Sequence, residues 1–398
     1  MEKKRAPFAK WMGNSNEITR LFLKAGQIPD MINLAGGLPE ASVYPASELA
    51  DIAKQVINKN PEETLGYCPI EGLPTLRDAI AKKFSKGNLK LSRENILIVT
   101  GAMQSLDLVG KVLLDDGARI AVQDPTYLGA LDAWRPRHPT LVPMNIHGHN
   151  FNPASLLENT QFAYTVPNFS NPTGSLVSKE CRQQLVDTSN DCGTWLVEDD
   201  PYGVLYYDSD PIPSMLELSA DENNDCYEGN VIYMGTLSKE IAPGLRLGWV
   251  IAAPEMINAL ATAKQGSDLC TSGLSQQITL EAINNGLMEK ILPNILAIYK
   301  SRRDGLCAAM EAYLTPYFTW EKPVGGMFVW AIAKDPKLNT DILLEYALDH
   351  GVCVTPSSVF DPNGEYRKAI RINFTHNPLE TLEQGIKRLA KATEQLKL

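Results

Sequence analysis

The chain has 398 residues, of which 44% are hydrophobic and 21% are charged, and its formal net charge is −10. A chain of this length and composition can bury a large core, which excludes an intrinsically disordered protein. The acidic balance, broken by one short basic cluster at residues 3–5, argues against nucleic acid as a partner and favours small molecules.

Cysteine usage and hydropathy indicate the compartment. The seven cysteines are an odd number and are scattered without a CxxC pair, which is typical of reduced cytosolic thiols. The first 20 residues are basic but contain no apolar segment of the kind found in signal peptides, and no stretch is long enough to cross a bilayer. We therefore expect a cytoplasmic protein without membrane association.

Short β-rich segments alternate with helical patterns through the first two thirds of the chain, as in a parallel sheet with crossover helices. Pro74 suits the first position of a helix that ends before Gly87, and Ser178 suits the N-cap of another through Leu185. The predicted strands are residues 95–100, 119–124, 162–166, 195–199, 231–235 and 247–253.

The pattern changes after about residue 285. A long helical stretch from Met288 to Leu314 leads to strand-like segments at 325–333, 352–356 and 369–374. Asn377 is then predicted to cap a final helix with apolar residues on one stripe. These elements indicate a second, smaller α+β domain.

One lysine, Lys239, lies between two strand-like segments with Thr236, Ser238 and Arg246 close by in the sequence. Two hydroxyls and a guanidinium suit a phosphate, and a desolvated lysine forms Schiff bases with carbonyl compounds. An isolated lysine is usually a surface charge, but this spacing, which includes Gly244, favours a functional role. A phosphorylated aldehyde such as pyridoxal phosphate would fit both features.

Pyridoxal phosphate makes further demands that the sequence meets. A carboxylate for the pyridine nitrogen is available in WLVEDDPYG, where Asp199 closes a predicted strand, although this acidic triplet also suits a turn cap. Asn171 in SNPTG and Tyr202 are candidate donors to the phenolic oxygen, although SNPTG is also an ordinary turn sequence. Gly101 opens a predicted helix that suits the phosphate, and Tyr127 could stack on the ring.

With these motifs the sequence resembles the fold type I pyridoxal-phosphate-dependent aminotransferases of class I and II. SKEIAPGLRLGW, SNPTG, EDDPYG and AIRINF follow the family's order over nearly the whole chain, and INLAGGLPEASVYP resembles the 2-aminoadipate and kynurenine aminotransferase branch. The resemblance implies an α/β fold with a mainly parallel seven-stranded sheet flanked by helices. With the boundary near residue 285 taken from the change in composition, we expect an N-terminal segment, 1–44, that packs with the small domain, a large cofactor-binding domain, 45–285, and a small α+β domain, 286–398.

The resemblance also implies roles for individual residues. Lys239 would form the Schiff base and move a proton between the substrate Cα and the cofactor C4′, while Asp199 would pair with the pyridinium. Arg371 would bind the substrate α-carboxylate, and Gly37 and Asn171 would also contact the substrate. The remaining cofactor contacts would come from Asn171 and Tyr202 at the phenolic oxygen, Tyr127 on the ring, and Gly101, Ala102, Met103, Thr236, Ser238 and Arg246 at the phosphate. Tyr67 would reach the phosphate of a neighbouring subunit, which makes the protein a homodimer with shared active sites.

Several residues have a simpler alternative. Arg371 also suits a surface ion pair, and Tyr67 and Tyr127 also suit packing. His147 and His149 form a His-x-His pair without a third ligand, so we predict no metal site. Where relatives carry Ser-Gln after the glycine of the phosphate loop, this chain has Ala102-Met103, which predicts a cofactor affinity weaker by about 1 kcal/mol.

The expected reaction is amino-group transfer from an L-amino acid to a 2-oxo acid in two half-reactions, with 2-oxoglutarate as the acceptor that the resemblance implies. Two alternatives are a pyridoxal-phosphate lyase that catalyses β-elimination and a ligand-sensing regulator with an aminotransferase-like domain. The regulator is disfavoured because the match begins within the first few dozen residues and the net charge opposes DNA. The donor stays open, and Arg20 suits either a distal carboxylate or a surface position.

Overall fold

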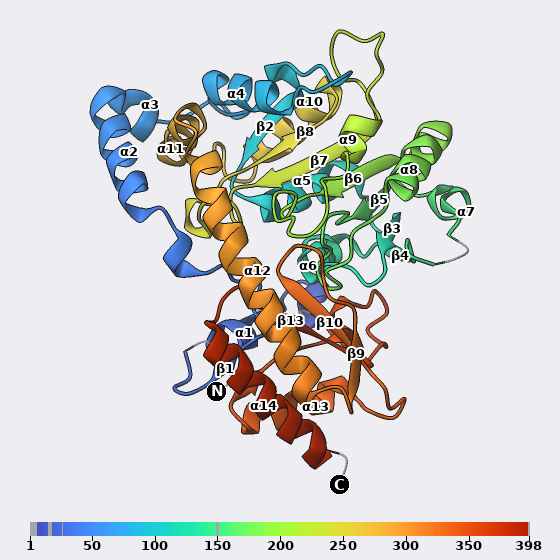
Figure 1. Cartoon of the computed structure of the whole chain (residues 1–398). Coiled ribbons are helices and arrows are strands. Elements are labelled where there is room, and N and C mark those ends of the chain that lie inside the picture. The colour runs from blue at the N-terminus through green and yellow to red at the C-terminus, as the bar shows by residue number, and fades with distance from the viewer. Residues whose placement is uncertain (1–5, 15–17, 26, 149–150, 397–398) are drawn as a thin grey trace.

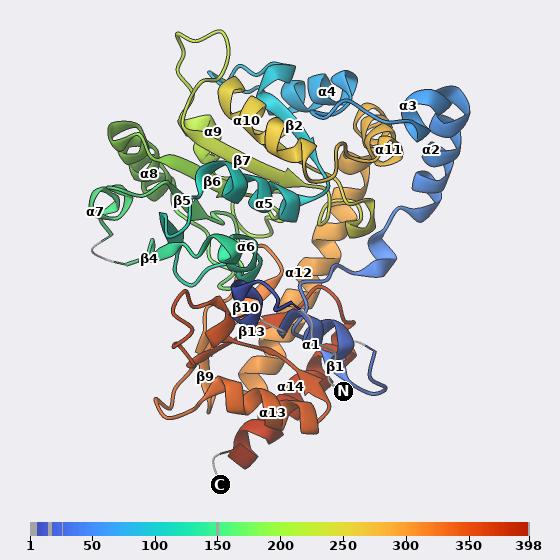
Figure 2. The same cartoon turned by 180° about the vertical axis from the view of Figure 1, so that it is seen from behind.

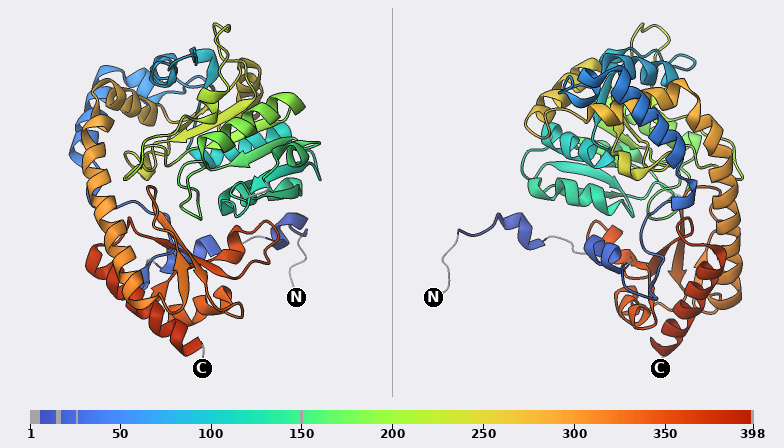
Figure 3. Two further views of the ribbon diagram at one scale, coloured as in Figure 1. Left: turned by 45° about the vertical axis from the view of Figure 1, so that its right-hand side comes forward. Right: turned by 90° about the vertical axis from the view of Figure 1, so that its left-hand side faces the viewer.

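The computed structural model describes residues 6–14, 18–25, 27–148 and 151–396. A helix-flanked sheet forms the larger body, and a smaller body of strands and helices lies below it in Figure 1. Helix α12 (Leu287–Tyr313) runs along both bodies and joins them (Figure 3, left). Within the described residues, no helix combines the length and apolar character needed to span a membrane.

The large sheet has seven strands in the order β2-β8-β7-β6-β5-β3-β4. Its strands are parallel except β8, which runs antiparallel to both of its neighbours. This confirms the predicted fold class. The strands are β2 (Ile96–Val99), β3 (Arg119–Gln123), β4 (Thr140–Met144), β5 (Phe162–Thr165), β6 (Trp195–Asp199), β7 (Val231–Thr236) and β8 (Gly248–Ile251).

Helices cover both faces of this sheet, which explains why its strands read as nearly continuous apolar runs. In β2, Leu97 and Val99 pack into one core cluster and Ile96 and Ile98 into the other. Helices α5 (Ala102–Leu113), α6 (Leu128–Trp134) and α10 (Pro254–Gln265) cover the first face, where α5 and α10 lie side by side (Figure 2). The second cluster includes residues of α4 (Pro74–Phe84), α8 (Lys179–Cys192), α9 (Met215–Leu218) and α11 (Gly273–Asn284).

The helix starts predicted in this part of the chain are correct. Pro74 is the first residue of α4, and the Ser178 hydroxyl accepts a hydrogen bond of 3.2 Å from the Cys181 amide at the start of α8. Strand β4 was not predicted because it is an edge strand that is only partly buried and contains Pro143. The remaining helices of this body are α2 (Ala46–Lys59), α3 (Pro61–Leu65) and α7 (Pro153–Leu157).

The smaller body contains a four-stranded antiparallel sheet in the order β12-β13-β10-β9. A separate parallel pair joins the N-terminal β1 (Ile32–Asn33) to β11 (Val352–Cys353). The four strands are β9 (Phe318–Trp320), β10 (Phe328–Ala333), β12 (Thr355–Pro356) and β13 (Ala369–Asn373), and the helices here are α1 (Ile18–Ala25), α13 (Thr340–Asp349) and α14 (Leu379–Leu396).

The prediction that Asn377 caps the last helix is wrong. Helix α14 begins at Leu379, so Asn377 lies one residue too early for a cap. Its side-chain amide instead donates a hydrogen bond of 2.9 Å to the carbonyl of Asn33, at the end of β1. A polar residue that suits a cap therefore holds the N-terminal segment in place.

After β1 the chain crosses between the two bodies through the segment Leu34–Leu38, which we call the strap and which bends at Ala35 and Gly36. The small body holds it through main-chain bonds: the Leu34 amide donates to the Cys353 carbonyl at 2.9 Å, and the Asn373 amide donates to the Leu34 carbonyl at 2.8 Å. The Thr375 hydroxyl donates to the Leu38 carbonyl at 2.8 Å. The strap forms one wall of the main cavity.

Candidate active site

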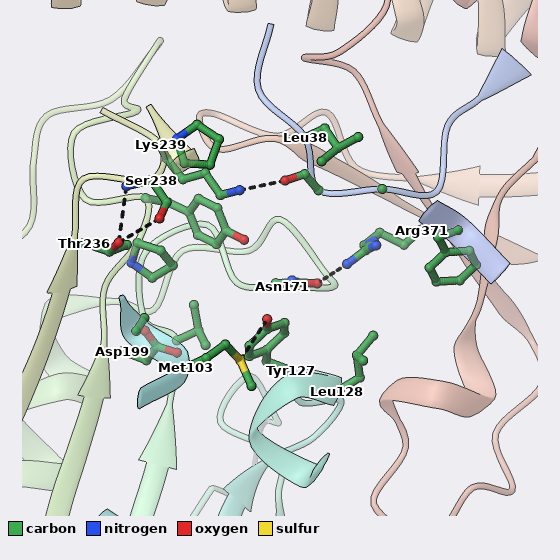
Figure 4. A pocket seen from close by; sticks show the side chains of 18 of the residues that line it. Leu38, Met103, Tyr127, Leu128, Asn171, Asp199, Thr236, Ser238, Lys239 and Arg371 are labelled. Atoms are coloured by element: carbon green, nitrogen blue, oxygen red, sulfur yellow. Dashed lines mark hydrogen bonds between the residues drawn. The ribbon is translucent and has the colours of Figure 1, made fainter. Parts of the chain in front are cut away.

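A cavity of about 300 Å³ lies where β6 and β7 end, facing the strap and the small body (Figure 4). The residues that line it come from both bodies and include every predicted site residue except Gly101 and Tyr67. They are Phe22, Gly36, Gly37, Leu38, Ala102, Met103, Tyr127, Leu128, Val166, Asn171, Asp199, Pro201, Tyr202, Thr236, Ser238, Lys239, Pro243, Arg246 and Arg371.

Lys239 follows β7 and extends into this cavity. Its amine donates a hydrogen bond of 2.7 Å to the carbonyl of Gly37 in the strap (Figure 4). Desolvation, together with the positive charges of Arg371 and Arg246, lowers the pKa of Lys239 to about 8. About a tenth of the amine is therefore uncharged at pH 7, far more than for a solvated lysine, and the uncharged form is the nucleophile.

Asp199 is the last residue of β6 and is only 3% exposed. Its Oδ2 accepts a hydrogen bond of 2.8 Å from the Tyr164 hydroxyl, while its Oδ1 is buried without a partner. Desolvation raises the pKa of Asp199 to about 7, although the Tyr164 hydrogen bond opposes that shift. A protonated ring nitrogen would satisfy Oδ1 and stabilise the carboxylate, so this residue fits a pyridine cofactor.

Hydrogen-bond donors that suit an anion gather around the start of α5. Helix α5 begins at Ala102 directly after Gly101, whose φ is +82°, and a Cβ at Gly101 would lie 2.5 Å from Nη2 of Arg246. Gly101 therefore lies behind the lining and lets the guanidinium approach the helix start. The hydroxyls of Thr236 and Ser238 lie 2.9 Å apart beside it. These groups suit a phosphate.

Arg371 lies on β13 and is 3% exposed. Its Nη1 donates a hydrogen bond of 2.5 Å to Asn171 Oδ1, its Nη2 donates to the Ala35 carbonyl, and its guanidinium lies between the rings of Phe328 and Phe360, 4.3 and 4.8 Å from their centres. Desolvation lowers the pKa of Arg371 to about 10, which leaves it cationic at neutral pH.

No described carboxylate forms an ion pair with Arg371. A buried cation without a counter-charge is costly unless a ligand supplies the anion. Because Arg371 is buried, it does not form an ion pair at the surface, which was the alternative interpretation of its sequence. The arrangement suits the carboxylate of a small ligand, bound bidentately.

Two tyrosines complete the cavity wall. The Tyr127 hydroxyl lies 3.6 Å from Met103 Sδ, and burial, together with the charge of Asp199, raises the pKa of Tyr127 to about 12. Burial also raises the pKa of Tyr202 well above its ordinary value. Both phenols are therefore protonated at neutral pH and can donate hydrogen bonds to a ligand.

Some predicted residues lie elsewhere. Tyr67 is 88% exposed and does not line the cavity of its own chain. Arg20 lies on α1 outside the lining. His147 Nε2 lies 2.9 Å from the hydroxyl of Ser175, whereas His149 falls outside the described residues.

The sequence reasoning missed Tyr164, Phe22 and Leu38. Tyr164 could have been found, because a tyrosine in a buried parallel strand usually places its hydroxyl on a polar partner. Phe22 and Leu38 gave no such signal, since their position in the wall depends on the β1–β11 pairing between residues far apart in the sequence.

Comparison with known proteins agrees with this geometry. The family model described as "Aminotransferase class I and II" matches residues 29–389. "Aromatic-amino-acid aminotransferase 1" of Thermococcus litoralis is 35% identical over 397 residues, which cover 97% of this chain and 93% of that protein. The solved structure of Pyrococcus horikoshii kynurenine aminotransferase, in complex with PMP, superimposes with a TM-score of 0.89 at 34% identity and covers 98% of both chains.

Similarity also extends to a different class of protein. An uncharacterised helix-turn-helix transcriptional regulator of Bacillus subtilis, YisV, is 31% identical over 376 residues, which cover 92% of this chain and 74% of the regulator.

Proposed function

The chain belongs to the class I and II aminotransferases, and we propose which of its residues perform the amino-group transfer. It is a pyridoxal-phosphate-dependent enzyme that transfers the amino group of an L-amino acid to a 2-oxo acid. When bound, the cofactor supplies an aldehyde that condenses with amines and a protonated ring that accepts an electron pair. One observation carries the assignment of roles: Lys239, the unpaired Oδ1 of Asp199 and the unpaired cation of Arg371 face one cavity.

The cofactor would be held at both ends and along its ring. Asp199 would bind the ring nitrogen, Asn171 and Tyr202 the phenolic oxygen, and Tyr127 one face of the ring. The phosphate would lie at the start of α5, where Ala102 and Met103 offer main-chain amides. Gly101, Thr236, Ser238 and Arg246 would complete this end.

Lys239 would hold the cofactor covalently through its amine. Once the substrate amine has taken its place, the freed Lys239 amine would act as the base that takes the proton from the substrate Cα. Its lowered pKa supports this role, because the amine must be uncharged to accept a proton at neutral pH. The hydrogen bond to the Gly37 carbonyl holds the amine within the cavity when no ligand engages it. Gly37 would then also contact the substrate.

Arg371 would bind the substrate α-carboxylate. The two aromatic rings and the Ala35 carbonyl fix the plane of its guanidinium, so a carboxylate meets donors that are already oriented. Asn171, which accepts from Arg371, would link the carboxylate site to the cofactor site.

The working form would be a cytoplasmic homodimer in which Tyr67 reaches the phosphate of the second copy. Tyr67 is 88% exposed and Leu65 is 65% exposed, which is unusual for such large side chains unless another surface covers them. Phe8, 90% exposed, lies on an N-terminal segment that extends away from the body in Figure 3, right. The division at residues 1–44, 45–285 and 286–398 is supported by the two separate sheets and the β1–β11 pairing.

A half-reaction experiment tests these roles. The purified holoenzyme is mixed with single amino acids, its visible absorption is followed, and the oxo acids formed are identified; 2-oxoglutarate is then added as acceptor. Stoichiometric exchange supports amino-group transfer, whereas ammonia and pyruvate from a cysteine-type substrate would indicate β-elimination. The Lys239→Ala variant should bind cofactor and lose at least about 10⁴-fold in rate, and full activity in that variant would refute the assignment.

A further inference from the structure

Lys264 and Asp268 form an ion pair beside Thr100, the residue that precedes Gly101; the lysine is buried and the aspartate side chain is 28% exposed. Lys264, near the end of α10, has a side chain that is 0% exposed, and its amine lies 2.9 Å from Asp268 Oδ1. Because solvent reaches Asp268 and screens the pair, the pair adds little to the free energy of unfolding. A role in positioning other groups would account for the pair better than a role in stability.

The second oxygen of Asp268 reaches the strand end that precedes α5. The Thr100 hydroxyl donates to Asp268 Oδ2 at 2.7 Å, and the Thr100 amide donates to Gln104 Oε1 at 2.7 Å. Desolvation raises the pKa of Asp268, but the interactions with Lys264, Thr100 and Gln104 bring that pKa below its ordinary value. The ionised carboxylate therefore joins Lys264 to Thr100.

Thr100 directly precedes the turn that would bind the phosphate. Gly101 follows it with a φ of +82°, and α5 begins at the next residue, Ala102. Gly101 packs against the guanidinium of Arg246 so closely that a Cβ would lie 2.5 Å from Nη2. A small displacement of Thr100 would therefore change where the α5 amides and Arg246 meet an anion.

The loop that carries Asp268 is itself held in an unfavourable backbone conformation. Leu269 has a φ of +63° and a side chain that is 46% exposed. The Ser267 amide donates to the Lys264 carbonyl at 2.9 Å, and the Cys270 amide donates to the Asp268 carbonyl at 2.7 Å. A left-handed leucine persists where surrounding bonds fix the loop, and such residues cluster near functional sites.

We infer that Lys264 and Asp268 are positioning residues for the cofactor phosphate. The ion pair fixes the Asp268 carboxylate, the carboxylate fixes the Thr100 hydroxyl, and Thr100 fixes the turn that presents the amides of Ala102 and Met103. Because this turn carries Ala102-Met103 and no hydroxyl, phosphate binding depends on where its main-chain donors lie. The inference rests on the proposed function, since it requires the phosphate at this end of the cavity.

The Thr100→Val variant tests the inference, because it breaks the link to the turn and leaves the ion pair intact. The apo protein is titrated with pyridoxamine 5′-phosphate and, separately, with pyridoxamine, by following tryptophan fluorescence. We expect about tenfold weaker binding of the phosphorylated ligand and unchanged binding of pyridoxamine. The matched control is Thr279→Val, whose hydroxyl donates only to the Ser275 carbonyl at 2.8 Å, and it should change neither affinity.

A double variant, Lys264→Met with Asp268→Leu, removes the pair without leaving a buried charge. It should show the same loss of affinity for pyridoxamine 5′-phosphate and no change in affinity for pyridoxamine. Equal loss for both ligands, or no loss in either variant, would overturn the inference, because the pair would then be structural only. Failure of the proposed function gives a different result: the wild-type protein itself would not distinguish the two ligands.

Discussion

The amine of Lys239 and the carbonyl of Gly37, 202 residues apart in the chain, share a hydrogen bond of 2.7 Å. The amine comes from the large body and the carbonyl from the strap that the small body holds. The pKa of Lys239 is nevertheless lowered to about 8, because desolvation and two neighbouring cations disfavour its charge, so the contact retains the amine without keeping it fully charged. The Lys239 amine is thus available for reaction and still fixed in place.

The first prediction concerns the pH dependence of cofactor loading. With a pKa of about 8, Lys239 is mostly protonated at pH 7 and mostly neutral at pH 9. The rate at which the apo protein takes up pyridoxal phosphate should therefore rise about tenfold over this range and then level off. Stopped-flow absorbance measures the rate. A rate that still climbs steeply above pH 10 would indicate an ordinary, solvated lysine.

The second prediction concerns the stability of the apo protein. The pKa of Asp199 is raised in the fold, to about 7, so its contribution to stability is complete below its unfolded pKa and is lost as pH rises through 7. The Asn variant, Asp199→Asn, should flatten this part of the pH dependence, which chemical denaturation measures. It should also reduce the rate of amino-group transfer by about 10²-fold or more, because no carboxylate then keeps the cofactor ring nitrogen protonated. Identical pH profiles for both proteins would contradict the burial of this carboxylate.

The third prediction separates backbone strain from ligand binding at Gly101. Gly101→Ala places a Cβ 2.5 Å from Arg246 Nη2 and also requires a left-handed alanine. Gly117→Ala is the matched control, since its φ is +80° and no atom lies within 4 Å of the added Cβ. Both variants should lose about 1 kcal/mol of unfolding free energy, but only the first should bind cofactor more weakly. Equal cofactor affinities, measured by equilibrium dialysis, would remove Arg246 from the phosphate site.

The fourth prediction tests the shared active site. Tyr67→Phe removes one hydroxyl from an exposed side chain, so dimerisation, followed by light scattering, should not change. Cofactor affinity should fall up to about tenfold if the hydroxyl binds the phosphate of the second copy. Tyr313→Phe, at another exposed tyrosine, is the control. A monomeric wild-type protein would eliminate the shared site altogether.

Local signals predicted much of this molecule from the sequence. Asp199 ends one buried strand and Lys239 follows another. Because parallel strands bring their carboxyl ends to one edge of the sheet, both residues could be placed together before the fold was known. Pro74 and Ser178 marked helix starts because their effect depends on the nearest turn alone.

What the sequence did not reveal depends on contacts between distant segments. Strand β1 has two residues and exists only through its pairing with β11, so no periodicity could mark it. The Asp268 carboxylate reaches Thr100 across 168 residues, and Asn377 holds Asn33 although its surroundings suit a cap. Contacts with residues far away in the sequence determine these roles, so the pattern within one segment cannot reveal them.

The strap offers a practical route to new substrate ranges. It contacts Lys239 and Arg371 through the carbonyls of Gly37 and Ala35, which every residue type possesses, whereas its Leu38 side chain faces the cavity. A saturation library at Leu38 would therefore change the shape of the substrate pocket while Lys239 and Arg371 keep their main-chain contacts. Gly37 should be left out of such a library, because an added Cβ would lie 3.0 Å from the Phe328 ring.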